Sequence, residues 1–301
     1  MSRPRWKRML RILFFISIPF LLFGGYVAYL LGMQAYDHFK KKEYAAQAID
    51  TASPTVYTDS VHIDYLEEYR KVYIYLPPDY ETDTLRYPVL YFFDGNALFN
   101  DAVLKGPEWQ LDNLMDSLSA VGGQTSIVVG VMHAKRRTPE YMPMTPPRTS
   151  EVDEVFGAKH AEWFATSLKA WVDSSLRTKP EARHTCIGGA SLGGLMAYYC
   201  LMAYPAVYDQ AIVLSPSFWV NDSIFSMHES VPDLHNKRIY LNVGEEEVYP
   251  MVPDARKMYK TLTAAGMPSE NLRFEIIEDE GHWHPTWRAG VKTAYPWIFA
   301  R

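Results

Sequence analysis

The chain has 301 residues, of which 48% are hydrophobic and 22% charged, and its formal net charge is −5. This composition is typical of a globular protein with enough apolar material for a sizeable core. A negative net charge provides no global basic field, so nucleic acid is not an expected partner. The two cysteines, Cys186 and Cys200, are too few for a disulfide framework, and we expect both to be unpaired core thiols.

The N-terminal residues predict a membrane segment. Basic residues concentrate in positions 1–11 and precede an uncharged apolar run at 12–33, which is long enough to cross a bilayer as a helix. A cleaved signal peptide is the alternative, but its apolar region is usually shorter and ends in a small-x-small site that fits this run poorly. A retained signal-anchor is therefore favoured, and the charge balance across the run, with five basic residues before it and three lysines at 40–42, puts the N-terminus in the cytoplasm. We therefore expect a single-pass protein of the cytoplasmic membrane, with the rest of the chain on the extracytoplasmic (periplasmic) side.

The remaining chain alternates between strand and helix patterns. Polar, Ala-rich residues 34–53 are expected to form a stalk, and residues 54–301 a folded domain. Apolar and β-rich runs predict strands at 56–65, 70–76, 87–93, 126–132, 183–187, 209–214, 238–243 and 272–277. Apolar residues at helical spacing predict helices at 109–118, 161–176, 192–203, 254–265 and 287–299, the last broken at Pro296. This alternation indicates an α/β fold whose mainly parallel sheet is covered on both faces.

One short motif points to chemistry. Gly189, Ser191 and Gly193 occupy the fixed positions of G-x-S-x-G, between an expected strand and an expected helix. In a nucleophile elbow, the serine sits on a strained strand-to-helix turn that exposes its hydroxyl, and the glycines avoid collisions with neighbouring backbone. A Gly-rich turn with a bystander serine is the alternative interpretation.

A serine hydroxyl is a weak nucleophile until a base removes its proton, and an acid usually orients that base. After such an elbow the acid and then the histidine follow later strands in chain order. Three consecutive glutamates, 245–247, follow the expected strand at 238–243, and His282 and His284 follow the strand at 272–277. The sequence thus offers a candidate for each partner of Ser191.

Further fragments make the resemblance to one family specific. From about residue 55 to 301, the chain resembles the esterase family of α/β hydrolases, which includes enterochelin-type esterases, feruloyl and acetylxylan esterases and mycolyltransferases. Besides the elbow, the matching fragments are the strand ending in Asp94-Gly95-Asn96, the R-x-x-x-Y-x-P loop at 137–143, the S-P-S-F-W segment at 215–219, and His282 followed by Trp287.

The resemblance implies roles for five residues. Ser191 corresponds to the family's nucleophile and His282 to its base, with His284 as the alternative base. Glu247, three residues after Gly244, stands where the family often places its acid, while Glu245 and Glu246 remain alternatives. The oxyanion hole of the family implies the backbone N–H groups of Asn96 and Leu192.

Candidate substrate contacts come from a long loop and from aromatic residues. Arg137 lies in the Pro- and Arg-rich loop at 135–157, where it can hold an anionic part of a substrate or simply pair with Glu140 or a backbone carbonyl. Trp219 and Trp283 can stack on an aromatic or sugar group, or belong to the core. No metal site and no cofactor are expected, because the pair His282 and His284 lacks further ligands at metal spacing.

Together these features predict a membrane-anchored serine esterase with a Ser-His-Glu triad that works through an acyl-enzyme. The resemblance suggests a small-molecule or glycan ester as substrate, such as a siderophore ester or a feruloylated or acetylated polysaccharide. Acyl transfer of the mycolyltransferase type is one alternative, and a catalytically silent binding module of the same fold is another.

Overall fold

The computed structural model describes residues 56–99, 108–147 and 154–300. Within these ranges no helix is long and apolar enough to cross a membrane. The span expected at 12–33 and the stalk expected at 34–53 lie outside them.

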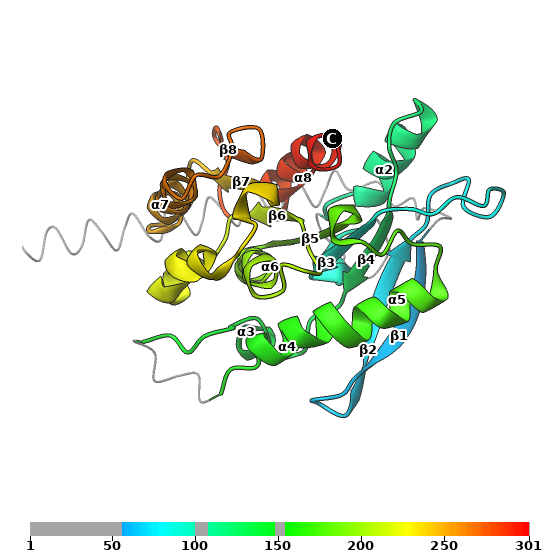
Figure 1. Cartoon of the computed structure of the whole chain (residues 1–301), viewed down its shortest axis with the longest axis horizontal. Helices are drawn as coiled ribbons and strands as arrows, with labels where there is room; N and C mark the ends of the chain where they lie inside the picture. Colours follow the sequence, from blue (N-terminus) through cyan, green and yellow to red (C-terminus); the bar gives the residue numbers. More distant parts are fainter. Residues whose placement is uncertain (1–55, 100–107, 148–153, 301) are drawn as a thin grey trace, which may run out of the picture. The chain divides into compact units, whose positions relative to one another are not determined.

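An eight-stranded sheet forms the centre of the domain (Figure 1). Its strands run in the order β1-β2-β4-β3-β5-β6-β7-β8. Only the pairs β1–β2 and β2–β4 are antiparallel, so the mainly parallel sheet predicted from the sequence is confirmed. The strand bounds are β1 Val56–Ile63, β2 Glu68–Tyr75, β3 Val89–Phe93, β4 Ile127–Val131, β5 Thr185–Ala190, β6 Gln210–Leu214, β7 Arg238–Gly244 and β8 Leu272–Ile277.

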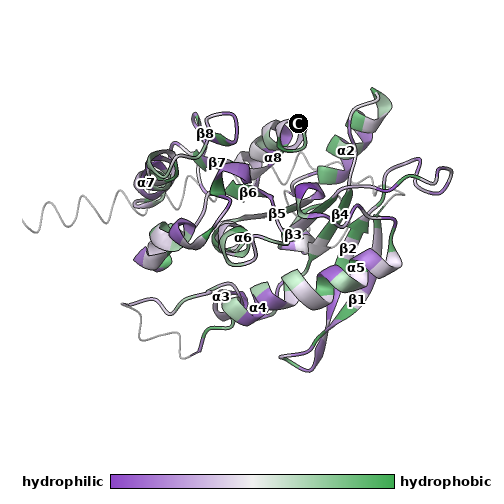
Figure 2. Cartoon of the chain, in the orientation of Figure 1, coloured by the Kyte–Doolittle hydropathy of each residue, from purple (hydrophilic) through white to green (hydrophobic). Residues whose placement is uncertain are grey.

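Helices cover both faces of the sheet. On one face lie α4 (Gly157–Trp163), α5 (Lys169–Ser175), α6 (Leu192–Ala203) and α7 (Met251–Ala264), whose apolar residues share one core cluster. On the other face lie α2 (Leu111–Ala120) and α8 (His284–Ile298), which contribute to a second cluster. Figure 2 shows polar and apolar residues alternating along α4 and α5, as expected of helices that bury one side and expose the other.

The central strands are apolar on both sides because both sheet faces are covered. All five residues of β3 are buried, and they alternate between the two clusters: Tyr91 and Phe93 face one, Leu90 and Phe92 the other. Burying this much apolar surface is the main force that holds the carboxyl ends of β3, β5, β6 and β7 in fixed positions.

Three local predictions were wrong. The strand expected at 183–187 is β5, which runs from Thr185 to Ala190, because residues 182–184 form a 3-10 turn, η3 (Ala182–His184). Helix α8 begins at His284 and continues through Pro296 without a break. Proline removes only one helical hydrogen bond, and the packing of α8 on β6 and β7 outweighs that loss. Between α4 and α5 the chain forms a π-helical turn, η2 (Phe164–Leu168), which apolar periodicity does not reveal.

The two cysteines are unpaired and buried, as predicted. Burial raises the pKa of the Cys186 thiol well above its usual range and raises that of Cys200 as well. Because the thiolate is the reactive form, we expect no labelling of either cysteine by Ellman's reagent in the native protein at pH 8. Both should react once the protein is unfolded in guanidinium chloride. Rapid labelling of the native protein would contradict this prediction.

Candidate active site

The elbow places Ser191 between β5 and α6. Its backbone has φ 61° and ψ −122°, a strained geometry for a residue with a side chain. The backbone N–H of Ser191 donates to the carbonyl of Leu214 at 3.0 Å, which ties the turn to the end of β6. A side chain at Gly189 would meet the backbone carbonyl of Gly193, so this close approach of strand and helix requires glycine.

His282 lies in the loop between β8 and α8, and it connects the serine to an acid. Its Nε2 is 2.9 Å from Ser191 Oγ, and its Nδ1 is 2.9 Å from Glu247 Oε2. A carboxylate only accepts hydrogen bonds, so the proton of the neutral ring lies on Nδ1 and Nε2 is left to accept from the serine hydroxyl. The structure therefore brings together the three side chains that the sequence placed on separate loops.

Glu247 is held from both sides. Its side chain is fully buried, and its Oε1 accepts hydrogen bonds from the Ser215 hydroxyl and from the backbone N–H of Gly244. With Oε1 fixed in this way, Oε2 points to His282. Glu245 and Glu246 are exposed, so they differ sharply from their neighbour in environment.

Ser215 and Trp287 were given no role by the sequence analysis. Ser215 directly follows β6 and is fully buried, and its hydroxyl oxygen accepts a hydrogen bond of 3.0 Å from the indole N–H of Trp287. The Trp287 ring also stands edge-on to the His282 ring, with centroids 5.3 Å apart. The signal that could have found them was in the sequence: both belong to the fragments that carry the family resemblance.

The alternative base, His284, lies apart from this relay. It begins α8, and its Nδ1 accepts a hydrogen bond of 3.1 Å from the indole N–H of Trp109. Its ring packs against Trp287 at a centroid distance of 5.0 Å. His284 is thus a neighbour of the relay, which it meets through Trp287.

The backbone segments proposed for the oxyanion hole lie at the same sheet edge. Asn96 sits in a 3-10 turn, η1 (Gly95–Ala97), directly after β3, and Leu192 is the first residue of α6, directly after Ser191. Strands β3 and β5 are parallel neighbours, so the segments that follow them emerge side by side. A side chain at Gly95 would collide with the backbone of Gly130, so the turn packs tightly on β4.

The three residues expected to contact the substrate differ in exposure and in their partners. Trp219 lies in η4 (Phe218–Val220) and is 48% exposed. Trp283 is only 4% exposed, and its indole N–H donates to the carboxylate of Glu280. Arg137 begins the short helix α3 (Arg137–Glu140) and forms an ion pair with Asp94 instead of Glu140, which pairs with the buried Arg70.

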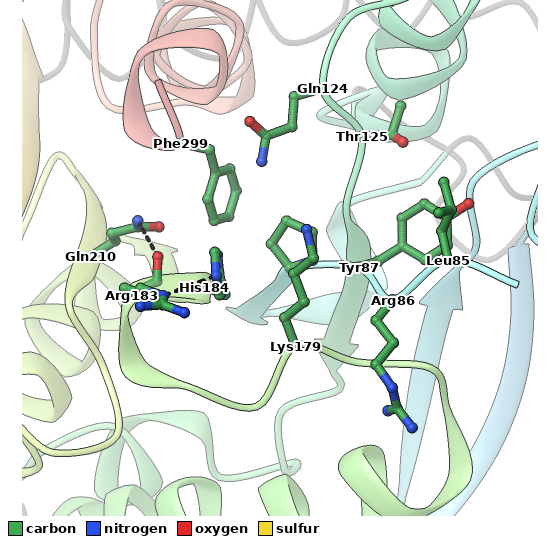
Figure 3. A pocket seen from close by; sticks show the side chains of 11 residues that line it. Leu85, Arg86, Tyr87, Gln124, Thr125, Lys179, Arg183, His184, Gln210 and Phe299 are labelled. Carbon is green, nitrogen blue, oxygen red and sulfur yellow. Dashed lines mark hydrogen bonds between the residues drawn. The ribbon is translucent and has the colours of Figure 1, made fainter. Parts of the chain in front are cut away.

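A pocket of about 570 Å³ lies at the end of the sheet opposite Ser191, where the parallel strands begin (Figure 3). Its lining residues Pro88, His184 and Gln210 precede or begin strands, whereas Ser191 follows one. In parallel α/β sheets, ligands bind at the carboxyl ends of the strands. The pocket is therefore separate from the relay, and its cationic side chains, including Arg86 and Arg183, are largely exposed.

Comparisons with known proteins identify the family and the fold. The Esterase family model matches residues 63–298. The uncharacterized protein YbbA of Bacillus subtilis is 22% identical over 244 residues, which cover 77% of this chain and 93% of YbbA. Among solved structures, the siderophore hydrolase EstA from Aspergillus nidulans superposes with a TM-score of 0.64 at 18% identity, covering 82% of this chain and 97% of that one. A ferulic acid esterase superposes with a TM-score of 0.63 at 18% identity, covering 81% and 97%. The chain thus belongs to the Esterase family of α/β hydrolases, and it is a carboxylic-ester hydrolase.

Proposed function

We propose that the protein hydrolyses its ester through a covalent acyl-enzyme formed on Ser191. The observation that carries this proposal is the relay of two 2.9 Å contacts from Ser191 through His282 to Glu247. His282 Nε2 takes the proton of Ser191 as Oγ attacks the carbonyl carbon, and Glu247 stabilises the imidazolium that forms. The proton on Nε2 then passes to the alcohol as the ester C–O bond breaks. Water attacks the acyl-enzyme in the same way, with His282 again as base.

The negative charge on the tetrahedral oxygen requires donors. We assign the N–H groups of Leu192 and Asn96 to this role, because their segments follow the neighbouring parallel strands β5 and β3. Removing one such donor from related sites costs about 3–4 kcal/mol of transition-state stabilisation. The reaction rate therefore depends on the turn that holds the N–H of Asn96 in place.

For the substrate, we propose a siderophore ester or a feruloyl or acetyl ester of a polysaccharide. The support is the likeness to a siderophore hydrolase and to a ferulic acid esterase. Trp219 is a large exposed aromatic residue two positions after Ser217, whose Oγ is 3.5 Å from Ser191 Oγ. An indole there can stack on an aromatic acyl group or on a sugar face. Turnover of acetyl, feruloyl and catecholate-type esters by the purified protein would rank these classes.

A fluorophosphonate probe tests the mechanism directly. The wild-type protein should be labelled, and peptide mass spectrometry should place the adduct on Ser191. Failure to label well-folded protein would favour the silent binding module. Acyl transfer to a sugar or lipid hydroxyl is the second catalytic candidate, and adding such acceptors to a hydrolysis assay would reveal it as a new ester product.

We also propose that residues 12–33 form a retained signal-anchor that leaves the hydrolase domain on the extracytoplasmic side. The support is the uncharged apolar run with basic residues before it. The full-length protein should stay in the membrane fraction after alkaline carbonate extraction, and protease added to spheroplasts should digest its hydrolase domain. Release of a shortened soluble domain would instead indicate a cleaved signal peptide.

A further inference from the structure

The guanidinium of Arg137 is bound to the carboxylate of Asp94. Its Nε and Nη2 donate to Oδ1 and Oδ2 at 2.6 and 2.7 Å, a bidentate geometry that fixes both groups in one plane. The same Nη2 is 3.4 Å from the carbonyl oxygen of Ala190, the residue before the nucleophile. Arg137 therefore links the turn after β3 to the elbow after β5.

Tyr141, from the same segment as Arg137, holds the same aspartate. Its hydroxyl oxygen accepts a 3.0 Å hydrogen bond from the backbone N–H of Asp94, and the Arg137 guanidinium lies 4.8 Å above its ring. The ring is fully buried, and burial raises the pKa of Tyr141 well above its usual range, so the phenol stays neutral. The two polar residues of the R-x-x-x-Y-x-P fragment thus converge on the aspartate of the D-G fragment.

Asp94 controls the turn that carries Asn96. Its backbone is left-handed, with φ 58°, a conformation that costs free energy in a residue with a side chain and needs support from its surroundings. Its carbonyl accepts from the N–H of Ala97 at 2.8 Å, which closes the turn around Asn96. A Cβ built on Gly193 would be 3.0 Å from Asp94 Oδ2, so the carboxylate also packs against the first turn of α6.

We propose that Arg137, Asp94 and Tyr141 form an oxyanion clamp, which positions the N–H of Asn96 relative to Ser191. Arg137 is then a positioning residue, and not the binding site for a substrate anion that its place in the loop suggested. The inference rests on the proposed function, because it concerns the oxyanion of that reaction. It assigns a shared task to two sequence fragments that are 43 residues apart.

Charge gives the clamp a second task. The Asp94 and Arg137 side chains are only 12% and 27% exposed, so water screens them incompletely. An unpaired Asp94 carboxylate beside the first turn of α6 would oppose the negative charge that develops on the substrate oxygen. The positive charge of Arg137, held in the bidentate pair, offsets that repulsion.

The test compares Arg137→Gln with Arg137→Lys on a neutral ester, p-nitrophenyl acetate, and on an anionic one, mono-p-nitrophenyl succinate. For Arg137→Gln we expect kcat to fall by about 30- to 300-fold on both esters, close to the loss of one oxyanion donor, while KM changes less than about threefold. Lysine keeps the positive charge but cannot form the two parallel hydrogen bonds of the guanidinium, so Arg137→Lys should have a kcat between those of Arg137→Gln and the wild type. Arg183→Gln, at the opposite sheet edge, is the matched control and should retain wild-type kcat.

A tetrahedral mimic separates positioning from a general loss of structure. The inhibition constant of a trifluoromethyl ketone should rise by about the same factor as kcat/KM falls, because the ketone forms the same oxyanion. Combining Asp94→Asn with Arg137→Gln should cost no more than Arg137→Gln alone, since both changes break one clamp and the second also removes the unpaired carboxylate. A rise in KM confined to the anionic ester, or an unchanged kcat, would overturn the clamp while leaving the proposed function intact. Activity in a Ser191→Ala variant would instead count against the proposed function itself.

Discussion

Replacing Ser191 with alanine is expected to lower kcat on p-nitrophenyl acetate by a factor of about 10⁵ to 10⁶, with little change in KM. The hydroxyl 2.9 Å from His282 Nε2 is the only oxygen of the relay that can attack the ester carbonyl, and no acyl-enzyme can form without it. Residual hydrolysis in related enzymes comes from the oxyanion hole and binding alone. The variant should unfold at a temperature close to that of the wild type, because one hydroxyl is lost from a site that remains packed.

Ser217→Ala is the matched control for this prediction. It removes another serine hydroxyl, 3.5 Å from Ser191 Oγ, in a residue that is only 2% exposed. In the described part of the chain, His282 Nε2 is paired with Ser191 Oγ and no hydrogen bond joins Ser217 to His282. Its kcat should stay within about tenfold of the wild type, because it loses at most one neutral hydrogen bond. The fluorophosphonate should label Ser217→Ala and spare Ser191→Ala. More than about 1% of wild-type kcat in Ser191→Ala, after a contaminating esterase has been excluded, would contradict a serine nucleophile.

The strands were predictable because their burial is visible in the sequence. The runs 89–93 and 127–131 contain no charged residue and no polar position that alternates with the apolar ones, which indicates strands covered on both faces. The positions of Ser191, Glu247 and His282 follow from the same regularity. Each ends a strand or follows one on the carboxyl side of a parallel sheet, so their chain order is enough to place them at one edge.

The supporting contacts could not be predicted, because they join segments far apart in the chain. The sequence analysis offered Arg137 a substrate anion, Glu140 or a backbone carbonyl as its partner, and Asp94, 43 residues away, was not among them. Glu140 instead forms a buried ion pair with Arg70, from β2. Ser215 likewise becomes a partner of Glu247 only once β6 and β7 lie side by side. Sequence patterns record which face a residue buries, but not which polar group it meets there.

Replacing Glu247 with glutamine is expected to lower kcat by a factor of about 10³ to 10⁴. Oε1 of this residue accepts from the Ser215 hydroxyl and from the Gly244 N–H, so in the variant the amide oxygen should take that position. The amide NH₂ then faces His282 Nδ1, which must accept a hydrogen bond. The proton of the neutral ring consequently moves to Nε2, where it blocks proton transfer from Ser191. Labelling by the fluorophosphonate should slow in parallel with kcat, because both depend on the same activated hydroxyl.

The glutamate triplet supplies its own controls. Glu245→Gln and Glu246→Gln make the same chemical change one and two residues away, on exposed side chains, and each should retain kcat within about twofold, since exposed charges contribute little. Glu247→Ala should lose no more activity than Glu247→Gln, because an absent carboxylate leaves the imidazole free to choose its tautomer, whereas the pinned amide enforces the wrong one. A large loss in Glu245→Gln or Glu246→Gln, with an active Glu247→Gln, would transfer the acid's role to a neighbour. The expected difference between Glu247→Gln and Glu247→Ala depends on the two donors that hold Oε1 of Glu247. Glu245 and Glu246 are exposed.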